Sequence, residues 1–298
     1  ATLARAGIRY TMLDVNQFAP AKPWLPAGAS LEADGFWDVF GAYTSEAQGA
    51  SVLVFPSSKR LRYWLPFQPV DRAREFLRGL RRDAPGAITF ADDGEKFGHW
   101  PNTHRWVHTD GWLESFLGML ERESDWLATS TFREYAARTE PSGRVHLPCG
   151  SYDEMLEWSG GFFRNFFVKY PEANAMQQKM LRVSESVRAA GRRRPLLARR
   201  AARELYLGQC NCAYWHGVFG GLYLAHLRRG VYRHLIAAEA LAHRAAGGRT
   251  GVSAMDADGD GRREARITTS AMSVTVDPAD GGAVTDWSLF GPRVNLID

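Results

Sequence analysis

The first hundred residues alternate between short apolar runs and one amphipathic segment, and this alternation constrains the fold more than any other feature. Residues 8–15, 51–56 and 87–90 have the length and composition of buried strands. Residues 70–82 follow a proline and place their apolar side chains on one face of a helix. An order of this kind predicts parallel strands joined by crossovers, in an open α/β sheet or a barrel.

The character of the sequence changes twice after residue 100. The apolar pattern predicts a helix at residues 111–123 and a short strand at 126–129, and Thr131 fits a capping box that opens a further helix. From about 150 to 245 the pattern is helical and strand signals are absent. Residues 252–298 then alternate in short segments with Gly/Asp turns, which predicts the opening strands of a β-sandwich.

The loop at residues 91–100 gathers three carboxylates, a lysine, a histidine and a tryptophan directly after the apolar run 87–90. Catalytic groups favour such junctions, because a strand fixes their position and a loop exposes them. If the chain stays extended, Asp92 and Asp93 point to opposite faces, so we expect at most one of them to enter a shared pocket. Acidic loops with glycine are also common as solvated turns. A second stretch at residues 209–221, which contains cysteines, aromatic residues and a histidine, favours a functional site instead.

The composition narrows the possible partners and compartments. The net charge is +4 and the pI is near 9.0, but much of the excess lies in arginines at 192–203, as on a solvated helix face, so we expect no nucleic-acid partner. No apolar run approaches the ~18 residues of a membrane span, so no membrane partner is expected. The three cysteines form no disulfide framework, which favours a reducing, cytoplasmic location. Because the chain begins with Ala1 instead of methionine, we expect an internal piece of a longer protein.

Several segments together resemble one protein family. Residues 92–101, Asp-Asp-Gly-Glu-Lys-Phe-Gly-His-Trp-Pro, are similar to the fourth conserved region of glycoside hydrolase family 57, and residues 209–221 are similar to its fifth. The resemblance is strongest to the 4-α-glucanotransferase and α-amylase type, and it extends over nearly the whole chain. Other similar segments follow the family order, at residues 54–56, 61–67, 147–148, 151–155 and 169–174.

The resemblance implies an α/β fold in three parts. Residues 1–137 would be the C-terminal part of a seven-stranded β/α barrel that carries the acid/base loop. Residues 138–248 would form a helical region that completes the substrate cleft, and residues 249–298 would begin a C-terminal β-sandwich. The first three conserved regions of the family, including the one with the glutamate nucleophile, would lie upstream of Ala1.

The resemblance also implies roles for individual residues. Family members cleave α-glucan linkages with retention, and Asp93 inherits the position of their acid/base. Glu95 and Trp100 inherit contacts to the sugar, and Trp215 lines the sugar site with His216 beside it. Considered alone, either tryptophan could equally belong to a hydrophobic core, and His216 could be a structural histidine.

The chain departs from the family pattern at several positions. An aspartate of the fifth region is replaced by Cys212, the histidine that often precedes the paired aspartates is Ala91, and a histidine after the first strand is Gln17. A thiol accepts hydrogen bonds poorly and is uncharged at neutral pH unless its pKa is lowered. Cys212 therefore puts substrate binding in question.

Retaining cleavage of a glycoside requires two carboxyl groups roughly 5–5.5 Å apart. One attacks the anomeric carbon, and the other donates a proton to the leaving oxygen. Asp93 would act first as acid and then as base, with an α-glucan or maltooligosaccharide as substrate and no cofactor needed for catalysis. Because the nucleophile would lie upstream, we expect this chain alone to be inactive.

A separate acidic motif precedes the C-terminal strands. Asp256, Asp258, Asp260 and Glu264 follow the pattern D-x-D-x-D-G-x-x-E, and alternate carboxylates around a glycine turn can converge on Ca²⁺. The glutamate of an EF-hand is absent at the twelfth position, which is Ile267. The motif therefore predicts a structural Ca²⁺ site in a β-loop, with an acidic turn at a domain boundary as the alternative.

Two alternatives to an enzyme stay open on the sequence alone. A catalytically degenerate relative that binds glucan without cleaving it is favoured by Cys212 and by the changes near Gln17. A structural module unrelated to sugars is disfavoured by the acidic and aromatic residues gathered at strand ends. The oligomeric state is open, and a homodimer is compatible with the sequence.

Overall fold

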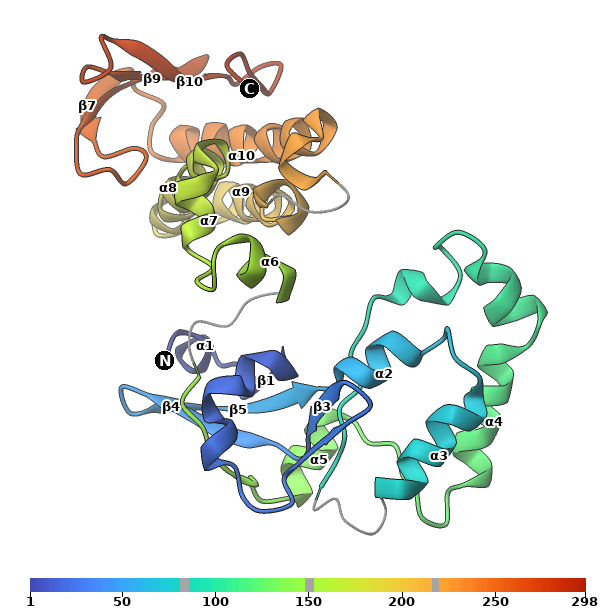
Figure 1. Cartoon of the computed structure of the whole chain (residues 1–298). Helices are drawn as coiled ribbons and strands as arrows, with labels where there is room; N and C mark the ends of the chain where they lie inside the picture. Colours follow the sequence, from blue (N-terminus) through green and yellow to red (C-terminus); the bar gives the residue numbers. More distant parts are fainter. Residues whose placement is uncertain (81–85, 148–152, 216–219) are drawn as a thin grey trace. The chain divides into compact units, whose positions relative to one another are not determined.

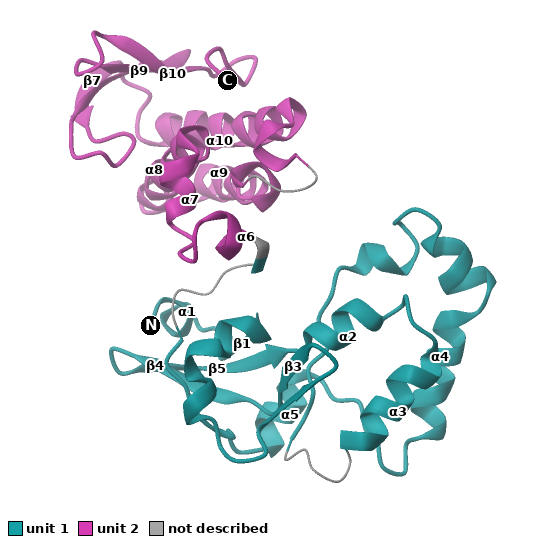
Figure 2. Cartoon of the chain, viewed as in Figure 1, with its two compact units in different colours: residues 1–153 teal, residues 154–298 magenta. Residues whose placement is uncertain are grey.

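The computed structural model describes residues 1–80, 86–147, 153–215 and 220–298. The chain divides into two compact units, residues 1–153 and residues 154–298 (Figure 2). Within the described ranges, no helix combines the length and the apolar character that crossing a bilayer requires.

The first unit is built on a sheet whose strands follow the order β1-β5-β4-β6 (Figure 1). β5 (Ala50–Ser57) is an apolar run, and it pairs in parallel with β1 (Tyr10–Asp14), as the alternation of the sequence predicts. On its other edge β5 pairs antiparallel with β4 (Tyr43–Ala47), which in turn is parallel to β6 (Gly143–Arg144). Parallel and antiparallel pairs therefore occur in one sheet.

Two tight hairpins in this unit were not anticipated from the sequence. β2 (Ser30–Ala33) and β3 (Phe36–Val39) are joined by Asp34-Gly35, and β4 and β5 are joined by Gln48-Gly49. All four turn residues have positive φ, the backbone conformation of a two-residue hairpin turn that matches strand twist. Asp-Gly between two strand-like segments is a strong hairpin signal, and residues 34–35 carry it.

The helices of the first unit confirm several predictions. α3 (Val70–Leu80) and α4 (Trp112–Arg122) lie in the predicted segments, although residues 81–82 of the first segment are outside the described residues. The two helices pack against each other around Leu65, Ala73 and Trp112. Thr131 forms the predicted capping box with Glu134. The other helical elements of this unit are α1 (Thr2–Arg5), η1 (Val15–Trp24), α2 (Lys59–Trp64), η2 (Gly94–Phe97), η3 (Arg105–Thr109) and α5 (Phe132–Arg138).

Two predicted strands in this unit were wrong in extent or in kind. Residues 126–129 form no strand. Trp126 is the last residue of a turn, residues 127–129 have no regular structure, and the indole Nε1 of Trp126 donates to Glu123 at 2.5 Å. Residues 87–90 supply only one bridge, in which Thr89 pairs in parallel with Ser57. The other residues of the run form no strand. Its direction is nevertheless the predicted one.

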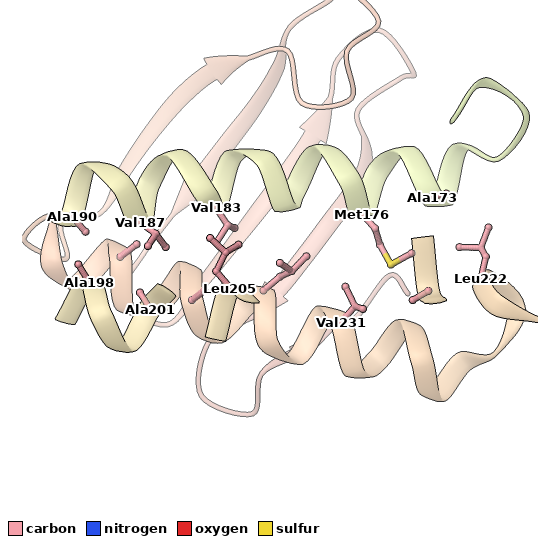
Figure 3. Close-up of a cluster of buried hydrophobic side chains, with 14 of the residues drawn as sticks. Ala173, Met176, Val183, Val187, Ala190, Ala198, Ala201, Leu205, Leu222 and Val231 are labelled. Atoms are coloured by element: carbon pink, nitrogen blue, oxygen red, sulfur yellow. The ribbon is translucent and has the colours of Figure 1, made fainter. Parts of the chain in front are cut away.

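The second unit has a helical core, as predicted for the described part of 150–245. α8 (Pro171–Gly191), α9 (Pro195–Leu207) and α10 (Ala225–Ala245) pack on one another through small and branched side chains (Figure 3). Alanines at the contacts let the helices approach closely, and the last helix ends just before Gly247-Gly248 as expected. The shorter helical elements are α6 (Asp153–Trp158), whose first residue belongs to the first unit, α7 (Asn165–Lys169), η4 (Asn211–Tyr214) and η5 (Gly221–Tyr223).

The second unit ends in an antiparallel sheet with the strand order β11-β10-β9-β8-β7. A buried cluster of charges joins this sheet to the helices. The ammonium of Lys179 on α8 lies 2.6 Å from Asp286 and 3.0 Å from Glu239 on α10, and Glu239 also pairs with Arg266. The strands are β7 (Gly251–Met255), β8 (Glu264–Thr268), β9 (Met272–Asp277), β10 (Ala283–Leu289) and β11 (Val294–Asn295).

The three kinds of structure thus occur in the predicted order along the chain: a sheet with parallel strands, a helical region and an antiparallel sheet. Closure of the first sheet into a seven-stranded barrel and a second layer for a sandwich stay predictions. The division into residues 1–137, 138–248 and 249–298 also stays a prediction.

Candidate active site

Parallel strand segments bring three parts of the first unit to the same edge of its sheet. β1 ends at Asp14, the neighbouring β5 ends at Ser57, and Thr89 pairs with Ser57 in the same direction. The amide of Ser58 donates to the carbonyl of Thr89 at 2.8 Å, which fixes this third segment. Loops that follow parallel strands gather at the carboxyl edge, where α/β proteins bind their ligands.

Asp92 lies at this edge as a buried ion-pair partner. Its side chain is only 2% exposed, and the ammonium of Lys96 lies 2.8 Å from each of its two oxygens. The Arg62 guanidinium Nε lies 3.5 Å from the same carboxylate. Burial raises the pKa of Asp92, although Lys96 and Arg62 oppose that rise. A carboxylate held in this way is not available to a ligand.

Asp93 is the accessible carboxylate of the pair. Its side chain is 46% exposed, and its Oδ2 lies 4.0 Å from the guanidinium of Arg62. Asp92 is thus enclosed and Asp93 is accessible, while Arg62 lies near both carboxylates. That at most one of the two enters a shared pocket stays a prediction. The catalytic role of Asp93 stays a prediction.

Glu95 and Trp100 belong to the same loop as Asp93. Glu95 is exposed on η2, and its carbonyl accepts hydrogen bonds from the amides of His99 at 2.8 Å and Trp100 at 3.0 Å. The indole of Trp100 stacks on Phe67, with ring centroids 6.0 Å apart and planes 23° apart. The structure thus places the predicted acid/base and two predicted sugar contacts on one short segment, beside a pair of stacked rings.

Sequence reasoning assigned no role to the residues that α2 brings to this edge. Lys59 pairs with Asp153 at 2.8 Å, and the side-chain amide of Asn16 donates to the same carboxylate at 2.8 Å. Burial raises the pKa of Asp14, and the charge of Asp153 adds to that rise. The available signal was the position of Lys59 and Arg62, two cations that directly follow a buried strand.

Trp215 lies in the second unit and is part of its core. It stacks on Trp158 with ring centroids 5.9 Å apart, and its carbonyl accepts from the amide of Leu222 at 2.7 Å. Gly221 has φ +35°, and a Cβ there would lie 2.1 Å from the carbonyl oxygen of Trp215. His216 lies outside the described residues. That Trp215 and Asp93 line one groove stays a prediction, because it joins two units.

Cys212 is exposed at the start of this stretch. Its sulfur lies 3.8 Å from the side-chain oxygen of Asn211, and neither Cys212 nor Cys210 is in a disulfide. The thiol therefore occupies a solvent-accessible place in the segment where the family pattern has an aspartate.

The acidic loop between β7 and β8 brings three of its four predicted metal ligands together. Carboxylate oxygens of Asp256, Asp258 and Asp260 all lie within 4.8 Å of one another, and all three residues are exposed. Glu264 does not join them, because its carboxylate is buried and accepts a hydrogen bond from the amide of Ala257. Amides of the loop also donate to the three aspartates, so part of their oxygen capacity is already used. Carboxylate oxygens are the kind of ligand that a hard cation such as Ca²⁺ prefers.

Two family models match the chain. The model of glycosyl hydrolase family 57 matches residues 1–148, and the model described as the middle domain of alpha-amylase/4-alpha-glucanotransferase matches residues 161–242. The first therefore includes the loop with Asp93 and Trp100, and the second includes the core helices of the second unit.

Similar proteins cover this chain from end to end. A 4-alpha-glucanotransferase of Thermococcus litoralis is 35% identical over all of this chain and 46% of its own length, and a 4-alpha-glucanotransferase of Thermococcus kodakarensis is 36% identical over the same shares. Alpha-amylase 1 of Dictyoglomus thermophilum is 34% identical over 99% of this chain and 45% of its own length.

A solved structure agrees with these matches. The crystal structure of 4-alpha-glucanotransferase from Thermococcus litoralis superposes with a TM-score of 0.79 and 34% sequence identity. The superposition covers 99% of this chain and 47% of the chain in that structure. This chain therefore spans about half the length of the relatives it matches. The fold, the order of the motifs and the sequence similarity agree: this chain belongs to glycosyl hydrolase family 57.

Proposed function

We propose that this chain is part of a retaining enzyme that cleaves or transfers α-1,4-linked glucose units, of the 4-α-glucanotransferase or α-amylase type. The observation that carries the proposal is the half-exposed carboxylate of Asp93 on a loop that belongs to the matched family region. Its neighbour Asp92 is committed to Lys96, so Asp93 is the one carboxylate of the pair that can meet a substrate. The relatives named 4-alpha-glucanotransferase and alpha-amylase support the substrate class.

In the proposed mechanism Asp93 protonates the leaving glycosidic oxygen and then removes a proton from the incoming hydroxyl. A glutamate upstream of this chain attacks the anomeric carbon. Trp100 offers a flat face to a pyranose ring, and Glu95 accepts hydrogen bonds from sugar hydroxyls. The contacts of Trp215 and His216 with the sugar stay expectations from the family resemblance. No cofactor takes part in catalysis.

Replacing Asp93 in the complete polypeptide tests this assignment. We expect Asp93→Asn to lower kcat on maltooligosaccharides by about 10²- to 10⁴-fold, the usual contribution of a general acid/base. The matched control is Asp71→Asn, which removes an exposed surface carboxylate that pairs with Arg74 at 3.1 Å. Turnover in Asp93→Asn equal to that of the control would refute the role of Asp93.

The chain on its own provides a second test. Since the nucleophile is proposed to lie upstream, residues 1–298 alone should show no turnover of maltooligosaccharides. Measurable product with the purified chain would mean that a carboxylate within these residues acts as the nucleophile, and the proposed division of the site would be wrong.

The second candidate function is a glucan-binding relative without turnover. Exposed Cys212 favours it, because a thiol replaces a carboxylate where the family has an aspartate. If this candidate is right, the complete protein binds maltooligosaccharides but does not cleave them. Cys212→Asp would then raise glucan affinity, measured by calorimetry, with Cys210→Asp as the control. Cleavage by the unaltered protein would rule this candidate out.

A structural Ca²⁺ ion at Asp256, Asp258 and Asp260 is a separate proposal about the second unit. The exposed carboxylates lie close enough to share one ion, and neutralising their mutual repulsion would stabilise the loop. Millimolar Ca²⁺ should raise the Tm, and Asp258→Asn should abolish that rise. Asp277→Asn is the control, since Asp277 accepts a loop amide at 2.8 Å but lies outside the group. An unchanged Tm in the presence of Ca²⁺ would refute the proposed Ca²⁺ site.

A further inference from the structure

The backbone of Asp93 is held on both sides by its two neighbours in the loop. Its amide donates to Oδ1 of Asp92 at 2.8 Å, and its carbonyl accepts from the amide of Lys96 at 3.3 Å. Asp92 and Lys96 are themselves joined through their side chains at 2.8 Å. The two residues therefore close a ring around the main chain of Asp93, and its half-exposed carboxylate lies outside the ring near Arg62.

The ammonium of Lys96 extends this ring to the aromatic residues of the site. It donates to the carbonyl of Arg62 at 2.7 Å, in addition to its contact with Asp92. It also lies 5.5 Å from the ring centre of Trp100, 5.8 Å from Phe67 and 5.9 Å from Tyr63. Cations near aromatic faces are attracted by the ring quadrupole, so the charge of Lys96 fixes rings as well as the carboxylate.

Neither member of the pair can reach a substrate. The Asp92 side chain is 2% exposed and that of Lys96 is 5% exposed. Two buried opposite charges are expensive to desolvate, and breaking such a pair leaves an uncompensated charge. A protein that only needed a stable loop could use apolar side chains here, so the pair calls for another explanation.

We propose that Asp92 and Lys96 are positioning residues that hold the acid/base Asp93 and the sugar platform Trp100 in one rigid unit and set the electrostatic field at Asp93. The proposal rests on the proposed function, because it assigns no new reaction. It adds two residues that act on Asp93 without touching the substrate.

The charges around Asp93 make the proposal testable by pH. Asp92, Glu95 and Lys96 come from its own loop, and Arg62 faces it from α2. Arg62 also acts on Asp14 at the end of β1, where Lys59 lies close by. Since Asp93 must be protonated to act as an acid, the alkaline limb of the kcat/KM profile follows its protonation.

The two single variants should move that limb in opposite directions. Asp92→Asn removes a negative charge beside Asp93, which favours ionised Asp93 and moves the limb to lower pH. Lys96→Met removes a positive charge, which favours protonated Asp93 and moves the limb to higher pH. Each shift should be on the order of one pH unit. Both variants should also lower kcat about 10- to 100-fold, because Asp93 loses its fixed position. Lys96→Met should in addition raise KM, because Trp100 loses the cation beside its ring.

The double variant separates the electrostatic effect of the pair on Asp93 from a general disruption of the loop. Asp92→Asn with Lys96→Met removes both buried charges, so the limb should return towards that of the unaltered enzyme while kcat stays low. Lys96→Arg keeps the charge but cannot reproduce the contacts, so it should lower kcat and leave the limb in place. These two variants keep the test decisive if Lys96→Met alone folds poorly.

The matched control is the exposed pair Lys22 and Glu32. Its atoms lie 2.6 Å apart, and Lys22 lies 5.2 Å from the ring centre of Trp37, so the chemistry is the same without burial. Lys22→Met and Glu32→Gln should leave both kcat and the limb unchanged. The proposal would be overturned if Asp92→Asn and Lys96→Met left kcat unchanged. It would also be overturned if both variants moved the alkaline limb of the pH profile in the same direction. An unaltered complete protein without turnover on α-glucans would overturn the proposed function, and the positioning role with it.

Discussion

At the scale of single residues, the surroundings give two neighbouring aspartates different chemistry. Asp92 is enclosed with Lys96, whereas Asp93 opens to solvent beside Arg62. Burial and charge pairing therefore decide which of the two neighbouring aspartates is accessible. The same reasoning applies wherever paired carboxylates follow a strand.

A second residue at this scale is Gly221, which has positive φ and touches the carbonyl of Trp215. We expect Gly221→Ala to destabilise the second unit by about 2 kcal/mol or more, because the added Cβ meets backbone that must shift. Gly230→Ala is the control, since nothing lies within 4 Å of its Cβ position in α10. That control should be neutral or stabilising by about 0.5–1 kcal/mol. Equal urea midpoints for Gly221→Ala and the unaltered chain would contradict this reading of the turn.

The sequence made Asp93, Glu95 and Trp100 candidates because they share one short motif, and their roles stay predictions. It could not identify Arg62 or Asp153 as members of the site edge. Their contacts join segments tens of residues apart, and such contacts follow from strand pairing instead of local pattern. The burial of Lys96 was equally hidden, since a lysine in an acidic loop is normally solvated.

At the scale of elements, strong periodicity and caps predicted helices well. α3 and α4 follow their apolar stripes, and α5 begins at the predicted capping box. Short apolar runs were less informative, because a strand also needs a neighbour with which to pair. Residues 126–129 pair with no strand in the described part of the chain and form no strand themselves.

The junction of helices and sheet in the second unit depends on a buried cation. Lys179 is 3% exposed and pairs with both Glu239 and Asp286. Lys179→Met leaves two buried carboxylates without this cation and should cost about 3–5 kcal/mol in the free energy of unfolding. Lys22→Met, in an exposed pair, should cost less than about 1 kcal/mol. Chemical denaturation of both variants compares them, and similar costs would show that the Lys179 cluster is not a structural link.

The same cluster predicts how stability depends on pH. Burial alone would raise the pKa of Glu239, but Lys179 and Arg266 outweigh it and lower the pKa from 4.5 to about 2. A carboxyl with a lowered pKa stabilises the folded state above its unfolded pKa and loses that contribution as the pH falls. Stability should therefore decline between pH 4.5 and pH 2, and Glu239→Gln should flatten this part of the profile. An unchanged slope in Glu239→Gln would contradict the lowered pKa.

At the scale of the whole molecule, the proposed site is divided among parts. Asp93, Glu95 and Trp100 lie in residues 1–153, and Trp215 lies in residues 154–298. The proposed nucleophile lies outside the chain altogether. This division follows from the order of the family motifs and stays a prediction; the chain spans about half the length of the relatives it matches.

The central claim is that Asp93 donates a proton to the leaving oxygen, and the leaving-group dependence of Asp93→Asn tests it most directly. In the complete polypeptide, the rate of bond cleavage is measured on a series of aryl maltosides whose phenols differ in acidity. We predict a large loss on substrates with poor leaving groups and rates near those of the unaltered enzyme on substrates that need no protonation. A loss of the same size across the whole series would contradict the claim.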